Sequence, residues 1–151
     1  MKVSKYMTQK LITATPAMSV KQAFLLMRTH RVRHIPVVEE EKLVGIISDR
    51  DLRRPRWAEQ LEDWTAYYQV NEDHTVSDVM TRNPETVRAS DDILKAVSIF
   101  REHRYGALPV LNKEGELTGI LSAQDLLGAL EEVLSKPDGR GARKGEKSRR
   151  S

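Results

Sequence analysis

The sequence has no cysteine, only eight aromatic residues (two Trp, four Tyr and two Phe) and no long apolar run. The absence of cysteine excludes disulfides and cysteine-ligated metal sites, and it makes a reducing compartment the simplest expectation. No apolar stretch approaches the roughly 18–20 residues that span a bilayer, and the N-terminus lacks the apolar core of a signal peptide. We therefore expect a soluble, cytoplasmic protein without a membrane segment.

Motifs of catalysis are also missing. The sequence contains no glycine-rich phosphate loop, no Ser/His/Asp set placed by a motif and no paired acidic residues outside turns. Its four histidines are not accompanied by cysteines or by carboxylates at ligand spacing. We expect neither an enzyme nor a metal site, and no resident cofactor.

The positive charge of the chain is confined to one end. Residues 136–151 hold seven Lys or Arg against two acidic residues, a net charge of +5, whereas the whole chain carries +3, so residues 1–135 carry −2. This segment has almost nothing to bury, and we expect a disordered basic tail. The tail either aids solubility or contacts nucleic acid or an acidic partner electrostatically.

The chain is an internal repeat. The clearest matches, at a shift of 73 residues, are Val3-Ser4 and Met7-Thr8 with Val76-Ser77 and Met80-Thr81, and Pro36-Val37 with Pro109-Val110. One added residue near Gly115 makes the shift 74, after which Gly45, Ile46, Ser48 and Asp51 match Gly119, Ile120, Ser122 and Asp125. Matches spread over about fifty positions indicate a tandem duplication.

Both copies predict the same order of elements. A short first run (Ile12–Thr15; Thr86–Arg88) precedes a helix, which we expect to be capped by Ser19 in one copy and Ser90 in the other. Apolar residues at i, i+3, i+4 and i+7 define its buried face: Val20, Ala23, Phe24 and Met27, then Ile93, Ala96, Val97 and Phe100. Two strands joined by a charged turn follow, Ile35–Val38 with Leu43–Ile47 and Leu108–Leu111 with Leu117–Leu121. A closing helix begins at Ser48 or Ser122.

One copy alone has too little apolar surface to fold. We therefore predict an α+β, sandwich-like fold in which two β-α-β-β-α repeats pack sheet to sheet with pseudo-twofold symmetry and leave a cleft at their junction. The predicted parts are repeat 1 (1–56), a connecting segment (57–73), repeat 2 (74–135) and the basic tail (136–151). Trp57, Leu61, Trp64 and Tyr68 share one helical face of the connecting segment, which we expect to pack on the globule or a second subunit, or to recognise a partner.

Ser48 with Asp51, and Ser122 with Asp125, place a hydroxyl, a carboxylate and free backbone N–H groups where a strand passes into a helix. Each pair can cap its own helix. Each can also hold a nucleotide, because a carboxylate accepts hydrogen bonds from both ribose hydroxyls and a helix start attracts phosphate. The two interpretations stay open here.

Cations are more frequent around the first pair. Arg50, Arg53 and Arg54 follow Ser48, and Arg31, Arg33 and His34 precede Pro36. The second copy has Ala123 and Gln124, and Gly106 and Ala107, at the corresponding places. We therefore predict that the first copy is better suited to a phosphorylated ligand, and that the second is empty or accepts a less charged one.

Three motifs occur twice, in register: a Met-Thr at the start of each copy, a Pro-Val in the first predicted strand, and Gly-h-h-Ser-x-x-Asp (h, apolar) at the end of the second. Together they resemble the cystathionine β-synthase (CBS) domain. Two such domains in tandem form a Bateman module. Without a catalytic domain, the chain is similar to bacterial stand-alone CBS-pair proteins, including the acetoin-utilisation type. The resemblance covers nearly all of residues 1–134 and implies a regulatory module and a homodimer. It also implies an adenosine ligand, such as AMP, ADP, ATP or S-adenosylmethionine, in the cleft between the repeats.

The resemblance also implies roles for individual residues. Asp51 and Asp125 would accept hydrogen bonds from the ribose hydroxyls, and Ser48 and Ser122, with the helix N-termini behind them, would contact the phosphate. Arg50 joins the predicted site as the cation that follows Ser48 in the first copy. The residues implied at the adenine edge are Thr13, Ala14 and Thr15, and Thr86, Val87 and Arg88. The residues implied as walls of the ring pocket are His34, Ile35 and Pro36, and Ala107, Leu108 and Pro109.

Three functions remain as alternatives. The first is a sensor in which an adenine nucleotide favours one relative orientation of the copies, which an unknown regulated protein reads. The second is a ligand-free dimerising scaffold that docks a partner through residues 57–68. The third is nucleic-acid binding through the tail at 136–151, which predicts a steep salt dependence.

Overall fold

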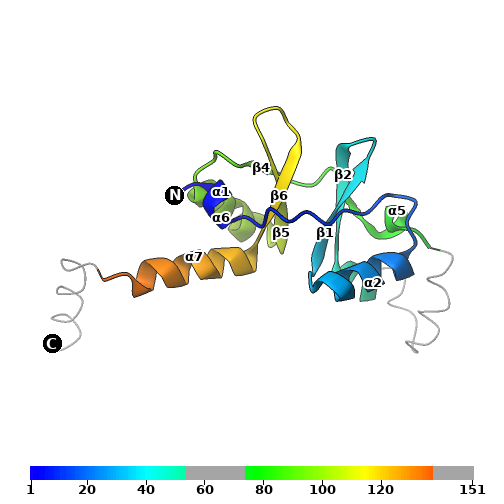
Figure 1. The fold of residues 1–151 in the computed structure, drawn as a ribbon, viewed down its shortest axis with the longest axis horizontal. Coiled ribbons are helices and arrows are strands. Elements are labelled where there is room, and N and C mark those ends of the chain that lie inside the picture. Colours follow the sequence, from blue (N-terminus) through cyan, green and yellow to red (C-terminus); the bar gives the residue numbers. More distant parts are fainter. Residues whose placement is uncertain (54–73, 138–151) are drawn as a thin grey trace.

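The computed structural model describes residues 1–53 and 74–137. The face formed by Trp57, Leu61, Trp64 and Tyr68, and nearly all of the basic tail, lie outside the described residues, so the predictions made for them stay predictions. The elements are α1 (Val3–Tyr6), α2 (Val20–His30), β1 (His34–Glu39), β2 (Lys42–Ser48), α3 (Asp49–Arg53), α5 (Val76–Val79), β3 (Thr81–Arg82), β4 (Val87–Arg88), α6 (Ile93–His103), β5 (Ala107–Leu111), β6 (Leu117–Ser122) and α7 (Ala123–Ser135) (Figure 1).

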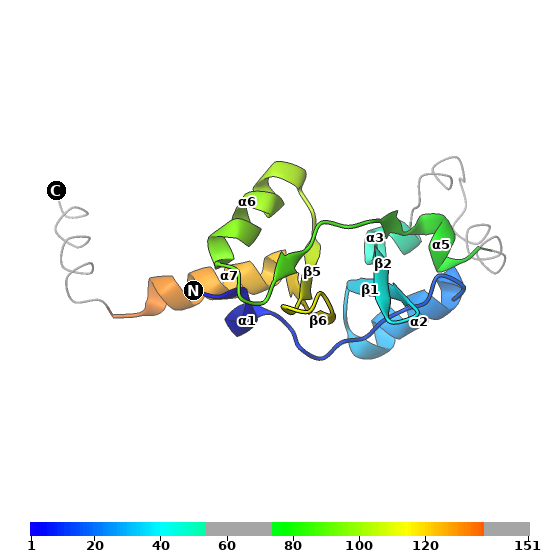
Figure 2. The same cartoon turned by 90° about the horizontal axis from the view of Figure 1, so that it is seen from above.

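The predicted strands are confirmed as two hairpins. β1 pairs antiparallel with β2, and β5 pairs antiparallel with β6. A third short strand completes each sheet, giving the orders β1-β2-β3 and β4-β5-β6. The result is the predicted α+β arrangement, with two similar halves side by side (Figures 1 and 2).

The long helix of each copy begins at a side-chain cap. The Ser19 cap is confirmed, because Ser19 Oγ accepts a hydrogen bond from Gln22 N at 3.0 Å and Gln22 Oε1 accepts one from Ser19 N at 3.1 Å. The prediction of Ser90 is wrong. Asp92 caps α6 instead, accepting a hydrogen bond from Leu94 N at 2.9 Å. Asp92 is the residue 73 positions after Ser19, and aspartate caps a helix as well as serine does.

Both long helices end at an arginine in the left-handed conformation. Arg31 has φ 56° and Arg104 has φ 55°. This conformation costs a residue other than glycine roughly 1–2 kcal/mol, and it turns the chain sharply from the helix into the next strand. The two turns, residues 31–34 and 104–107, lie where the halves meet.

The first segment of each copy packs on the sheet of the other copy. Thr81 of the second copy pairs with Ile46 of β2. Thr8 of the first copy exchanges two backbone hydrogen bonds with Ile120 of β6, at 2.8 and 3.0 Å. In Figures 1 and 2, α1 accordingly lies beside α7 at one end of the molecule and α5 lies beside α2 at the other. Lys5 of α1 also donates a hydrogen bond to Glu132 of α7 at 3.1 Å.

Two glycines make this exchange possible. A Cβ atom on Gly45 would lie 2.9 Å from the Thr81 carbonyl oxygen, and one on Gly119 would lie 2.9 Å from the Thr8 carbonyl oxygen. Neither glycine has a positive φ, so the close approach of the exchanged backbone is what requires glycine there. The repeated Met-Thr and the repeated glycine are therefore two sides of one contact between the copies.

Each half has its own hydrophobic core, and each core needs a residue from the other copy. The first core includes Val20, Ala23, Ile35, Ile47 and Leu52 together with the fully buried Val76 of the second copy. The second includes Val87, Ala96, Leu108, Val110 and Leu121 together with the fully buried Val3 of the first. The exchanged segments therefore complete the hydrophobic core of each half.

Within residues 1–53 and 74–137, no helix has the length and apolar character needed to cross a membrane. The same residues hold no group of three or more His, Cys, Asp or Glu side chains arranged to bind a metal ion.

Candidate ligand-binding site

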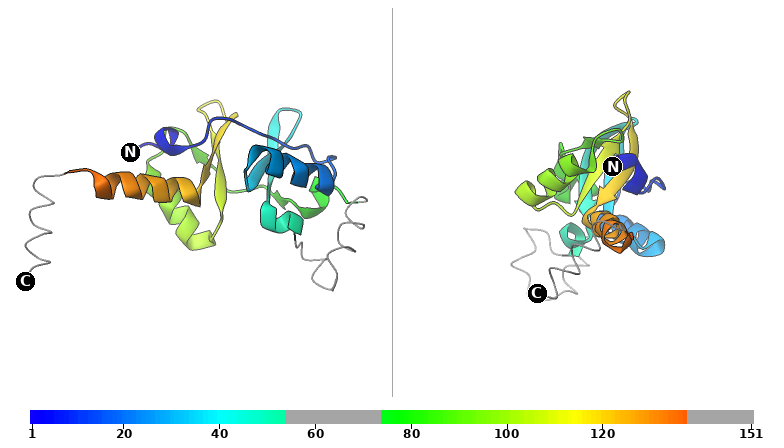
Figure 3. Two further views of the ribbon diagram at one scale, coloured as in Figure 1. Left: turned by 60° about the horizontal axis from the view of Figure 1, so that its bottom comes forward. Right: turned by 90° about the vertical axis from the view of Figure 1, so that its left-hand side faces the viewer.

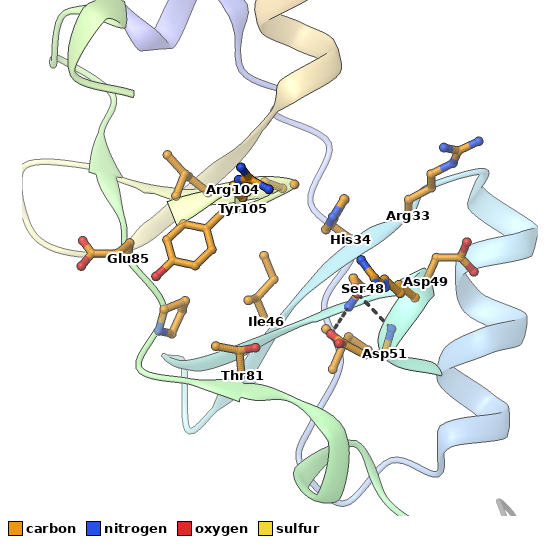
Figure 4. A pocket seen from close by; sticks show the side chains of 16 residues that line it. Arg33, His34, Ile46, Ser48, Asp49, Asp51, Thr81, Glu85, Arg104 and Tyr105 are labelled. Atoms are coloured by element: carbon orange, nitrogen blue, oxygen red, sulfur yellow. Dashed lines mark hydrogen bonds between the residues drawn. The ribbon is translucent and has the colours of Figure 1, made fainter. Parts of the chain in front are cut away.

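Two clefts lie where the halves meet, and each takes residues from both copies. The first, here called the Asp51 cleft, has a volume of about 460 Å³. On one side it has the end of β2 and the start of α3, with Ser48 and Asp51, and on the other it has Arg104, Tyr105 and residues 106–108 of the second copy (Figure 4). Thr81, Pro84 and Glu85, between the halves, complete its lining.

The second cleft, here called the Asp125 cleft, has the same construction with the copies interchanged. Its volume is about 640 Å³. Ser122 and Asp125, at the start of α7, face residues 31–34 and Pro36 of the first copy, and Thr8 occupies the place that Thr81 has in the other cleft. Both volumes lie in the range of about 300–1,000 Å³ that is usual for small-molecule sites.

The serine and the aspartate of each cleft cap their own helix. Asp51 Oδ2 accepts a hydrogen bond from Ser48 N at 2.9 Å, and Ser48 Oγ accepts one from Asp51 N at 3.0 Å (Figure 4). Ser122 and Asp125 repeat this arrangement at 2.8 and 3.0 Å. The capping interpretation is therefore confirmed for both pairs.

Capping leaves both side chains able to bind a ligand. A carboxylate has about four acceptor sites, and no described residue donates to Oδ1 of Asp51 or Asp125. Each serine hydroxyl uses its oxygen as an acceptor for the cap, and its hydrogen remains available for donation. By contrast, the first N–H group of each helix is already used, because Asp49 N donates to Arg33 O at 2.7 Å and Ala123 N donates to Gly106 O at 3.0 Å.

His34 lies between the two clefts and lines both. A Cβ atom on Gly106 would lie 2.8 Å from the ring carbon Cε1 of His34, so the imidazole packs directly on the backbone of the opposite half. Burial lowers the pKa of His34 below its ordinary value. The Asp51 carboxylate opposes this shift, and the Arg33 guanidinium adds to it. The lowered pKa favours the neutral ring, which can act as a hydrogen-bond donor and acceptor.

The charges are distributed differently from the prediction. Arg31 lies in the Asp125 cleft, not beside Asp51, because each helix-to-strand turn faces the aspartate of the other copy. Arg33 lines both clefts. The prediction that the first copy is better suited to a phosphorylated ligand assumed that the residues close in sequence to Ser48 and to Pro36 share one cleft, and the position of Arg31 contradicts that assumption. Arg54 lies outside the described residues, and the ligand preference itself stays a prediction.

About half of the residues implied by the resemblance line a cleft. They are His34, Ser48, Arg50, Asp51, Ala107 and Leu108 in the Asp51 cleft, and His34, Pro36, Ala107, Ser122 and Asp125 in the Asp125 cleft. Thr13, Ala14, Thr15, Ile35, Thr86, Val87, Arg88 and Pro109 line neither. Ala14, Ile35 and Val87 are buried in the two cores, and Arg88 donates to the carbonyl oxygens of Asn112 and Lys113 in the β5–β6 turn. The role of these residues in binding stays a prediction.

Sequence reasoning missed the residues that reach the clefts from the other copy. Leu11 and Ile12 line the Asp125 cleft, and Pro84 and Glu85 line the Asp51 cleft, immediately before the segments that the resemblance implied. Tyr105 was missed as well. The repeated Met-Thr marks the connections that lead to these residues, but these residues do not themselves indicate that they cross to the other half.

Comparison with known proteins identifies the family. The CBS domain model matches residues 3–56 and 76–132. A CBS domain-containing protein of Dictyostelium discoideum is 33% identical over 137 residues, which are 87% of this chain and 92% of that protein. The inosine-5'-monophosphate dehydrogenase of Korarchaeum cryptofilum is 31% identical over 125 residues, which are 83% of this chain but only 23% of the enzyme.

Solved structures agree with this relationship. The crystal structure of the CBS-pair protein CBSX2 from Arabidopsis thaliana has a TM-score of 0.77 and 28% identity, covering 90% of this chain and 98% of that one. The crystal structure of CBSX2 in complex with AMP has a TM-score of 0.70 and 30% identity, covering 87% of this chain and 97% of that one. With matching family segments in both of its copies, the chain belongs to the CBS domain family and is a tandem CBS pair.

Proposed function

We propose that this CBS pair is a regulatory module that binds an adenosine ligand in the clefts between its halves. The observation that carries the proposal is the pair of clefts, each with an aspartate whose Oδ1 is open to the ribose hydroxyls of a ligand. The AMP complex of CBSX2, a relative with 30% identity, supports an adenine nucleotide as the ligand class.

The ligand would contact both halves at once. Its ribose would bind Asp51 or Asp125 at a helix start, and its base and phosphate would lie against the turn of the opposite copy, at residues 104–108 or 31–34. A ligand that bridges the halves favours the relative orientation in which both sets of contacts are made. A regulated protein, or a second copy of the chain, would respond to that orientation, and the coupling is limited by the difference in ligand affinity between the two orientations.

Isothermal titration calorimetry with AMP, ADP, ATP and S-adenosylmethionine tests the proposal. We expect binding to the unmodified chain and weaker binding to Asp51→Asn and Asp125→Asn. Asparagine keeps an oxygen for the cap but replaces the second acceptor with an NH2 donor, which repels the donors of a ribose diol. Asp78→Asn is the matched control, because Asp78 Oδ2 accepts a hydrogen bond from Thr75 N at 2.9 Å in the same kind of cap and lines neither cleft.

If none of the four ligands binds at sub-millimolar concentration, the proposal is wrong. The remaining candidate would then be the ligand-free scaffold, which one feature of the structure favours. α7 extends from the body of the molecule (Figure 3) and leaves apolar side chains exposed at Leu127 (58%), Leu130 (51%), Val133 (49%) and Leu134 (75%). An apolar helix face of this kind is typical of a protein interface.

We propose that the α7 face pairs with a second copy of the chain, so that the module is a homodimer. Leu127, Leu130 and Leu134 are spaced at i, i+3 and i+7, one stripe along the helix. A homodimer is compatible with the sensor and with the scaffold. Ligand titration therefore distinguishes the two functions, and a measurement of mass does not.

A further inference from the structure

Building on the proposed function, we propose that the two clefts select ligands by charge. The Asp125 cleft is the site for a nucleoside di- or triphosphate. The Asp51 cleft disfavours additional phosphates and accepts a monophosphate or a less charged adenosyl ligand. This is the reverse of the order that the sequence of each copy predicts.

The formal charges of the clefts differ. The Asp125 cleft is lined by three cationic side chains, Lys10, Arg31 and Arg33, and by one carboxylate, Asp125. The Asp51 cleft is lined by three arginines (Arg33, Arg50 and Arg104) and by three carboxylates (Asp49, Asp51 and Glu85). Counted over the described residues, the Asp125 cleft therefore carries a formal charge of +2 and the Asp51 cleft a formal charge of zero.

Equivalent positions of the repeat account for this difference. Glu85 corresponds to Ile12 and Asp49 corresponds to Ala123, so two carboxylates of the Asp51 cleft are replaced by apolar residues in the Asp125 cleft. Lys10 corresponds to Asn83, which does not line the Asp51 cleft. Arg31 and Arg104 correspond to each other and supply one cation to each cleft. The difference in charge between the clefts thus comes mainly from Lys10 and from the two carboxylates that the Asp125 cleft lacks.

The cations of the Asp125 cleft are available to a ligand. Lys10, Arg31 and Arg33 are exposed, and none of them forms an ion pair with a residue in the described part of the chain. The cleft also contains the start of α7, a helix of 13 residues, and the N-terminal end of a helix attracts anions. ATP carries about two more negative charges than AMP at neutral pH, so each further phosphate gains attraction in this cleft.

The test isolates each cleft and compares AMP with ATP by calorimetry, in EDTA so that no divalent cation neutralises the phosphates. In Asp51→Asn, where the Asp125 cleft remains, we expect ATP to bind roughly fivefold or more tightly than AMP, from one or two additional charge contacts. In Asp125→Asn, where the Asp51 cleft remains, we expect ATP to bind no more tightly than AMP. Raising the salt concentration should reduce ATP affinity in the first variant more than in the second.

Two neutralising substitutions on exposed residues provide the reciprocal test without altering either core. Arg31→Gln, added to Asp51→Asn, should lower the preference for ATP roughly two- to fivefold. Glu85→Gln, added to Asp125→Asn, should raise that preference by a similar factor. The charge selection would be overturned if the ratio of ATP affinity to AMP affinity were the same in the two clefts, or if neither substitution changed that ratio. Either result would leave the proposed function intact. The absence of binding to the unmodified chain would overturn both.

Discussion

The exchange of segments between the copies can be tested by adding one methyl group. In Gly119→Ala, the new Cβ would lie 2.9 Å from the Thr8 carbonyl oxygen and 2.8 Å from Met7 Sδ. The methionine side chain can move aside at low cost. The Thr8 carbonyl cannot, because it accepts the hydrogen bond from Ile120 N at 3.0 Å that holds the exchanged segment on β6. The backbone must therefore shift by several tenths of an ångström.

The expected size of the effect follows from two opposing contributions. Overpacking of this kind costs about 1–3 kcal/mol, and replacing glycine with alanine restricts the unfolded chain and stabilises by about 0.4–1 kcal/mol. The net prediction is a destabilisation of about 1–2 kcal/mol, measured as the change in the free energy of unfolding in urea by circular dichroism. Gly45→Ala should behave in the same way, since its Cβ would lie 2.9 Å from the Thr81 carbonyl oxygen.

Gly128→Ala is the matched control. Gly128 lies inside α7, and a Cβ there would meet nothing within 4 Å. The same chemical change should therefore stabilise the chain by about 0.5–1 kcal/mol through helix propensity. Hydrogen exchange adds a local readout, because the Ile120 amide should lose protection in Gly119→Ala. If Gly119→Ala is as stabilising as Gly128→Ala, and the Ile120 amide stays protected, the exchanged packing described above is incorrect.

Three further predictions concern the cap of α6, the shared histidine and the exposed face of α7. Asp92→Ala should destabilise the chain by about 1 kcal/mol in urea unfolding, because it removes the cap of α6. Ser90→Ala should change the stability little. A larger loss of stability in Ser90→Ala than in Asp92→Ala would show that Ser90 is the cap. Since burial lowers the pKa of His34, the unfolded chain binds more protons below pH 6.5, and stability should fall as the pH drops from 6.5 through the pKa of the folded state. This fall in stability should be smaller in His34→Gln than in the control His103→Gln. An equal fall in both variants would show that His34 does not cause the pH dependence. Leu130→Lys should shift the chain to a monomer in light scattering if α7 forms the dimer interface, and an unmodified chain that is already monomeric would refute the dimer.

Local patterns were sufficient to predict much of the fold. The spacing of Val20, Ala23 and Met27 predicts the buried face of α2, and all three are buried. The apolar runs around Pro36 and Pro109 predict the hairpins, because strand pairing across a short charged turn is a local event. Ser48 with Asp51, and Ser122 with Asp125, were also recognisable, since a capping box needs only four consecutive residues.

The exchange between the copies was not predictable from these patterns. Whether Thr8 pairs with the strand of its own copy or with Ile120 depends on contacts across more than a hundred residues of chain, which periodicity does not record. The cleft that Arg31 lines was not predictable for the same reason, because its turn faces the aspartate of the other copy rather than the aspartate nearest in sequence. Gly45 and Gly119 are the signal that the sequence offers for the exchange, since a glycine inside a strand often marks the close approach of another backbone.

Removing one oxygen atom from the ligand tests most directly whether the two aspartates bind a ribose diol. Calorimetry would compare AMP with 2′-deoxyadenosine monophosphate on the unmodified chain and on the Asp51→Asn, Asp125→Asn double variant, as a double-mutant cycle. A hydrogen bond to a carboxylate contributes about 1.5–3 kcal/mol, so the unmodified chain should bind AMP at least tenfold more tightly than the deoxy ligand. In the double variant this preference should disappear. Equal affinity for both ligands on the unmodified chain, or the same preference for AMP in the double variant, would show that the aspartates do not bind the ribose hydroxyls.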